Sequence, residues 1–288
     1  MVRVWFFPAV VVLGMGGGGC AHVASAPDWP TSPAALFRGQ GWDAAAKLPS
    51  RSEVVAGQLV IHADFPLAGQ HRLVRELEAM RVDVSQQLGL PISDEPVHLY
   101  LFENPARYES FVAATFPTFP ARRAFFVETD TTLSVYAAWQ DRMAEDLRHE
   151  TTHGYVHAVV PTVPLWLDEG IAEYFELPRT ENGLHSAHVA HLAGRIIEGT
   201  WRPDMARLEA LQSAGEMSQD HYAEAWCWVH WLLSTTPERQ TLLQDYLAGV
   251  RRDATGAPLS QRLRLVSGDP AGELLDHVQH LADLNEPR

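Results

Sequence analysis

Two stretches decide how this chain folds: Leu147-Arg148-His149-Glu150-Thr151-Thr152-His153 and Trp166-Leu167-Asp168-Glu169-Gly170-Ile171-Ala172-Glu173-Tyr174-Phe175. The first contains the pattern H-E-x-x-H, which is typical of a zinc-binding helix. Residues four apart lie one above the other on a helix, so His149 and His153 can direct their imidazoles at one ion. Glu150 lies roughly 100° further around the helix. It therefore flanks the ion, which is the position of a general base.

A catalytic zinc site needs a third protein ligand and one open position. Glu169 is the candidate, because the fifteen residues between His153 and Glu169 suffice to end one helix and begin the next. Glu173 lies one turn further on the same face. It is expected to accept a hydrogen bond from the far ring nitrogen of a zinc-bound histidine. Gly170 is expected to let the two motif helices approach closely.

The two stretches together resemble the gluzincin class of zinc metallopeptidases, and more narrowly the bacterial peptidase MA-like proteins. The resemblance covers about 30 residues, from Arg148 to Glu176. It implies a zinc ion held by His149, His153 and Glu169, with Glu150 as the base. The loop between the motifs is shorter than in the well-known aminopeptidases of the class, so the shape of the cleft is expected to differ.

The segments around the motifs predict an α+β fold, in which a small mixed sheet packs on the H-E-x-x-H helix and a mainly helical C-terminal lobe follows. The motif helix is expected to begin at an N-cap Asp141, to run through Ala158 and to end before Pro161. Hydrophobic periodicity predicts strands at 59–65, 97–102, 124–128 and 132–136, and helices at 70–88, 106–116, 188–198, 204–213, 219–234, 237–250 and 271–284.

The zincin-like domain is expected at residues 53–180 and the helical lobe at 181–288. In the class that the chain resembles, an edge strand of the sheet lines the cleft and holds the substrate by strand addition. Residues 132–138 are the candidate for that strand.

The N-terminal residues 1–19 have the pattern of an export signal, with Arg3 before an apolar run and a series of glycines. Cys20 follows the glycines and resembles the lipidated cysteine of bacterial lipoproteins. Gly17 stands where such proteins usually have an aliphatic residue, so plain secretion is the alternative. Residues 20–52 are rich in proline, alanine and serine, which is typical of a tether.

The composition is that of a globular protein, with 46% hydrophobic and 20% charged residues. The formal net charge of −14 argues against a nucleic-acid partner and against adsorption on an anionic membrane. A membrane is expected as a partner only through a lipid anchor at Cys20.

Further histidines and one tyrosine have competing interpretations. His157 is eight residues from His149, about 12 Å along a helix, so a core or supporting position is favoured over a ligand. His185, His188 and His191 invite a second metal site, but a solvated or cleft-lining helix face is favoured because no acid or cysteine pattern accompanies them. Tyr222, with His221 as second choice, is the candidate donor to the oxyanion of peptide hydrolysis; the alternative for the Tyr222 helix is an amphipathic core element.

The sequence therefore predicts an exported zinc metallopeptidase that acts on a peptide or protein substrate through Glu150-assisted attack of zinc-bound water. The alternative is a lipoprotein of the cell envelope that keeps the zinc site but acts as a binding or scaffold protein. Hydrolysis of a non-peptide amide also remains open, because the motifs specify metal chemistry and not the substrate.

Overall fold

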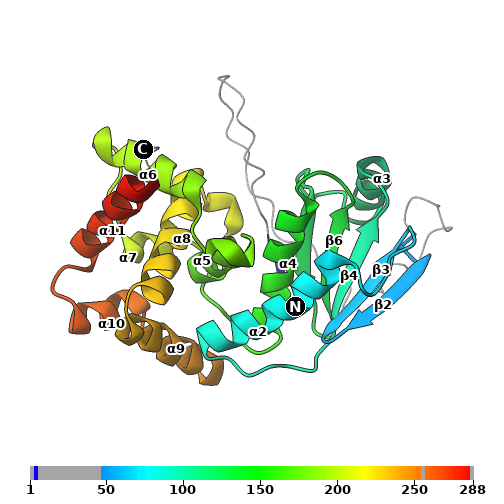
Figure 1. Cartoon of the computed structure of the whole chain (residues 1–288), viewed down its shortest axis with the longest axis horizontal. Coiled ribbons are helices and arrows are strands. Elements are labelled where there is room, and N and C mark those ends of the chain that lie inside the picture. Colours follow the sequence, from blue (N-terminus) through cyan, green and yellow to red (C-terminus); the bar gives the residue numbers. More distant parts are fainter. Residues whose placement is uncertain (1–2, 6–46, 254–256, 286–288) are drawn as a thin grey trace.

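A mixed six-stranded sheet forms one side of the molecule and a group of helices forms the other (Figure 1). The computed structural model describes residues 3–5, 47–253 and 257–285. The predicted α+β fold with a helical C-terminal part is confirmed. The predicted export signal lies outside these residues except for the strand Arg3–Trp5, as do Cys20 and most of the tether.

The sheet joins parallel and antiparallel strands in the order β1-β5-β6-β4-β3-β2. β3 pairs in parallel with β4, and β4 with β6, whereas the other neighbours are antiparallel. The strands are β1 (Arg3–Trp5), β2 (Ser52–Ala56), β3 (Leu59–Ala63), β4 (Val97–Phe102), β5 (Ala124–Glu128) and β6 (Leu133–Ala138).

The helices follow or interrupt these strands, and the C-terminal third of the described chain contains helices without strands. No helix of the described residues is long and apolar enough to cross a bilayer. The helices are α2 (Arg72–Leu88), α3 (Pro105–Thr115), α4 (Met143–His157), α5 (Leu165–Phe175), α6 (Ser186–Ile197), α7 (Met205–Glu209), α8 (Gln219–Ser234), α9 (Pro237–Arg252), α10 (Leu259–Val266) and α11 (Pro270–Asn285), with short 3₁₀ turns at Arg179–Glu181 and Ala214–Glu216.

Alternating side chains give the sheet two apolar faces. Phe126 and Val135 belong to the main core, which also contains buried residues of α2 and α4. Phe125 and Tyr136, their neighbours in sequence, pack on the other face in a second cluster with Phe111 of α3. This alternation follows from the period of two in a strand, and it holds the motif helix α4 on one defined face of the sheet.

Glycines set how closely the two motif helices approach their neighbours. A Cβ on Gly154 of α4 would lie 2.6 Å from Cγ1 of Val97, so α4 lies directly against β4. A Cβ on Gly170 of α5 would lie 2.5 Å from the carbonyl oxygen of Ala225 in α8. The expectation that Gly170 serves the contact between the two motif helices is therefore wrong: it allows α5 to pack against α8.

Other details also differ from the sequence-based expectations. β6 lies between β5 and β4, so residues 132–138 are not an edge strand. The N-cap of α4 is Arg142, with a left-handed φ of 65°, rather than Asp141. β2 and α10 were not predicted; β2 forms a hairpin with β3 through Gly57, whose φ of 58° favours glycine.

Candidate metal centre

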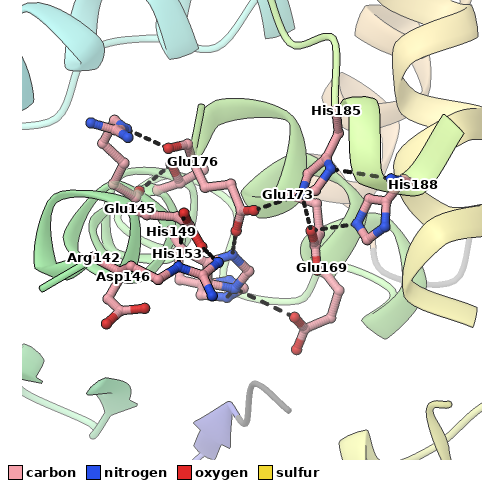
Figure 2. A network of polar contacts seen from close by, with 12 residues as sticks. Arg142, Glu145, Asp146, His149, His153, Glu169, Glu173, Glu176, His185 and His188 are labelled. Carbon is pink, nitrogen blue, oxygen red and sulfur yellow. Dashed lines mark hydrogen bonds and ion pairs between the residues drawn. The ribbon is translucent and has the colours of Figure 1, made fainter. Parts of the chain in front are cut away.

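The two histidines of the H-E-x-x-H helix meet as helical geometry requires. The Nε2 atoms of His149 and His153 lie 3.1 Å apart, and both rings are buried. α4 ends after His157, and α5 begins after its N-cap Pro164. α5 packs on α4, and this contact brings Glu169 close to the two histidines. Figure 2 shows the Glu169 side chain directed toward the two imidazoles.

Glu169 is a carboxylate in an unusual setting. Its side chain is 0% exposed, and neither of its oxygens has a hydrogen-bond partner among the described residues. Its Oε2 lies 3.6 Å from Nε2 of His149. Burial raises the pKa of Glu169 well above its usual range, and the nearby Asp168 and Glu150 raise it further. A buried carboxylate without a donor is costly unless a cation compensates it.

The far ring nitrogens of both histidines point at carboxylates. Nδ1 of His149 lies 3.0 Å from Oε2 of Glu176, and Nδ1 of His153 lies 3.0 Å from Oδ2 of Asp168. These contacts place the Nδ1 protons on the carboxylate side and leave both Nε2 atoms facing Glu169, which is how carboxylates orient metal-binding histidines.

The structure places the expected supporting residue, Glu173, elsewhere. Its Oε2 lies 2.7 Å from Nε2 of His188 and 3.8 Å from Nε2 of His185. Burial raises the pKa of Glu173 to about 7, against the lowering effect of His185. The contact with a zinc-binding histidine that was expected of Glu173 is made by Glu176 instead. Residues 169, 173 and 176 share one face of the helix, and Glu176 is the one whose carboxylate contacts Nδ1 of His149.

Asp168 is part of a buried series of polar contacts that joins it to His157 and Glu128. Its Oδ2 also lies 3.1 Å from Nε2 of His157, whose Nδ1 lies 2.9 Å from Oε2 of Glu128 on β5. Burial disfavours the charged ring, but Asp168 and Glu128 raise the pKa of His157 to about 9. His157 therefore carries a proton on both nitrogens and supports Asp168. His153, His157 and Asp168 also have ligand atoms within 4.8 Å of one another, so the supporting position of His157 stays a prediction.

Glu150 extends from α4 toward Phe126 of β5. Its carboxylate accepts a hydrogen bond from the backbone N–H of Phe126, and burial raises its pKa well above the usual range while Arg122 opposes that effect. A pocket reaches this point between the loop before β5 and the end of α5. It is lined by Arg122, Arg123, Ala124, Asp146, His149, Glu150 and Glu176.

Tyr222 lies on the first turns of α8 and is buried. Burial raises the pKa of its hydroxyl, and the charges of Glu169, Arg122 and Glu150 act on it. His221 has a different position: its Nδ1 accepts a hydrogen bond from the backbone N–H of Ser218 and caps α8.

The residues fit a zinc ion. One ligand atom from each of His149, His153 and Glu169 lies within 4.8 Å of the other two. Two imidazoles and one carboxylate are ligands that zinc takes in catalytic sites. The orphaned carboxylate of Glu169 and the outward-facing Nδ1 atoms of both histidines are the features that such an ion requires.

Three contributors to this arrangement were not identified from the sequence. Glu176 stands two turns after Glu169 on the same helical face, and that spacing is the signal that would have found it. Asp168 adjoins Glu169 in the sequence, but its two histidine contacts depend on how α5 packs on α4. Arg122 precedes β5 in a loop, and no local pattern marks it.

Comparisons with known proteins add the following. Residues 144–255 match a family described as "Protein of unknown function (DUF1570)". Among solved structures, the chain is similar to an M1 zinc metallopeptidase from Deinococcus radiodurans, with 16% sequence identity and a TM-score of 0.43, over 82% of this chain and 51% of that one. The chain thus spans about half the length of that enzyme. No curated protein matches in sequence.

Proposed function

We propose that the protein is a zinc-dependent peptide hydrolase of gluzincin type. One observation carries the proposal: the fully buried carboxylate of Glu169 has no hydrogen-bond donor within the part of the chain that the structure describes, and it faces two imidazoles whose other nitrogens are directed at carboxylates. A core without a cation has no reason to keep this set of groups, because each would be cheaper to replace by apolar side chains. In this role His149, His153 and Glu169 hold the ion.

When bound, zinc supplies a Lewis acid that polarises the scissile carbonyl and lowers the pKa of water. The carboxylate of Glu150 accepts a hydrogen bond from the backbone N–H of Phe126, which supports its role as the base. It takes a proton from the attacking water and passes it to the leaving amine. Tyr222 donates a hydrogen bond to the oxyanion that develops on the substrate carbonyl.

The proposed setting is the cell envelope. An export signal at residues 1–19 and a lipid anchor at Cys20 would place the domain that follows outside the cytoplasm, with peptides or proteins as substrates. The net charge of −14 supports the absence of nucleic-acid partners.

Two variants and a chelator test the proposal. The wild-type protein should cleave casein or a peptide library, and should lose that activity on chelation and regain it with Zn²⁺. Glu150→Gln should keep its zinc and lose at least about 100-fold in kcat, because the base is removed and the ligands are not. His153→Ala should lose the metal, as measured by elemental analysis.

The same experiment distinguishes a peptidase from a binding or scaffold protein. A folded wild-type chain that holds one zinc ion between His149, His153 and Glu169 and cleaves no peptide would be a binding or scaffold protein. A Glu150→Gln variant with full activity would exclude the proposed mechanism.

A further inference from the structure

A second group of metal-binding side chains lies beside the first, on the α6 side of α5. Figure 2 shows Glu173, His185 and His188 gathered next to the pair of His149 and His153. Glu173 comes from α5, His188 from the first turns of α6, and His185 is the N-cap of α6. The sequence showed two of these histidines but not the acid, which folding brings from another helix.

The ligand atoms converge. One atom from each of Glu173, His185 and His188 lies within 4.8 Å of the other two. The Nε2 atoms of both histidines face Oε2 of Glu173, at 3.8 Å from His185 and 2.7 Å from His188. The two rings are stacked with centroids 3.8 Å apart, so both imidazoles border the same carboxylate.

A further carboxylate lies beside this set. Oε1 of Glu176 lies 3.1 Å from Nε2 of His185, but the group whose ligand atoms all lie within 4.8 Å of one another contains only Glu173, His185 and His188. Two imidazoles and one carboxylate form a ligand set that suits zinc and similar divalent ions, and Glu176 adds a second carboxylate next to it.

We propose that Glu173, His185 and His188 bind a second divalent transition-metal ion of the zinc type, with the carboxylate of Glu176 beside it. This inference does not rest on the proposed peptidase activity, because the three ligands are a different set of side chains. His185 is partly exposed and gives the ion a path from solvent.

Metal binding requires one rearrangement of protons. Nδ1 of His185 accepts the backbone N–H of His188 at 3.3 Å, so a neutral His185 carries its proton on Nε2. An ion on Nε2 moves that proton to Nδ1 and removes the cap. The cap is a single hydrogen bond, whereas a bound zinc ion gains a bond from each of its ligands, so the ion wins this competition.

Glu176 connects the two centres. Its Oε2 holds Nδ1 of His149 while its Oε1 faces His185. Arg148, a buried neighbour on α4, donates to the backbone carbonyl of Glu176 and fixes the end of α5. An ion at the second site therefore fixes the carboxylate that orients His149.

Metal stoichiometry tests the proposal. The full chain is freed of metal with a chelator, reloaded with Zn²⁺, freed of excess ion and analysed for zinc per chain. Wild type should hold two ions. His188→Gln and Glu173→Gln should each hold one, and His153→Ala should also hold one, because it removes only the first centre.

His191→Gln is the matched control, since His191 lies on the same helix but contacts Asp220, and it should keep two ions. One ion in wild type, or two ions in folded His188→Gln and Glu173→Gln, would overturn the second site. Circular dichroism establishes that each variant is folded. If His188→Gln fails to fold, the number of zinc ions bound by Glu173→Gln and by His153→Ala still tests the second site. A His153→Ala chain that keeps one ion supports the second centre even where wild type cleaves no peptide.

Discussion

The carboxylate of Asp168 serves two buried rings at once. Its Oδ2 lies 3.0 Å from Nδ1 of His153 and 3.1 Å from Nε2 of His157. Burial alone would raise its pKa, but His153 and His157 hold that pKa below the usual range. Asp168 thus keeps its charge and, with Glu128, stabilises the protonated ring of His157.

Asp168→Asn should weaken both functions. Zinc affinity should fall about 10- to 100-fold because His153 loses the acceptor that orients it. The free energy of unfolding should fall by about 3 kcal/mol or more, since the buried His157 cation keeps only Glu128. Competition with a chromophoric chelator measures the first and urea unfolding the second.

Asp220→Asn is the control for that variant, because it removes a carboxylate from His191 at a partly exposed position. It should leave the zinc affinity of the first centre unchanged. Equal zinc affinities in wild type and Asp168→Asn would show that the Asp168 carboxylate does not orient His153.

Tyr222→Phe tests the donor to the oxyanion. Its kcat should fall about 10- to 1000-fold with little change in KM, because the hydroxyl acts on the developing charge and not on the ground-state substrate. The variant should retain its zinc. His221→Ala, which removes only a helix cap, should keep its kcat; the reverse pattern would assign the donor to His221.

α5 is held on both sides, by α4 and by α8. Its contact with α8 is close because Gly170 faces the carbonyl of Ala225 and the side chain of Val229. Gly170→Ala should therefore destabilise the protein by about 1–3 kcal/mol. The matched control is Gly194→Ala in α6, where a Cβ would meet nothing within 4 Å.

That control should be neutral or stabilise the chain by up to about 1 kcal/mol, since alanine is the better helix former. Thermal unfolding of both variants gives the comparison. A Gly170→Ala variant as stable as wild type would mean that the α5–α8 contact relaxes without cost.

The elements show which local patterns suffice for a prediction. The span of α8 was predicted to the residue, because a long apolar segment is bounded by polar residues, and the segment is buried from Tyr222 to Leu232. The position of β6 in the sheet was not predicted correctly, since strand order depends on pairing between segments far apart in sequence. An alternating sequence gives a strand its faces but not its neighbours.

The described helices and the sheet share one continuous main core, from Leu59 on β3 to Leu281 on α11. A histidine pair lies at the contact of α8 and α11, where Nδ1 of His230 is 2.9 Å from Nε2 of His277. Burial and the partner ring lower the pKa of His230 to about 4. Burial, followed by His280 and Arg239, lowers the pKa of His277 to about 4.

Stability should therefore depend on pH at this contact. Both folded pKa values lie below the ordinary value of about 6.5, so between pH 6.5 and pH 4 the unfolded chain binds more protons than the folded one. The stabilisation is present above pH 6.5 and is lost as the pH falls toward 4. Urea unfolding at pH 7.5 and pH 5 should show this loss, and His277→Gln should reduce it. Parallel pH profiles for wild type and variant would contradict the assignment.

The motifs in the sequence determined the histidine pair, the base and the third ligand as candidates, because helical periodicity alone places residues four apart on one face and a short loop returns the next helix to it. Tertiary packing decided what surrounds them. Glu128, Asp168 and Glu176 reach the histidines, and Glu173 reaches His185 and His188, only because strands and helices distant in the sequence pack together. Local spacing fixes the face of an element, whereas the partner of that face is chosen by the burial of the whole core.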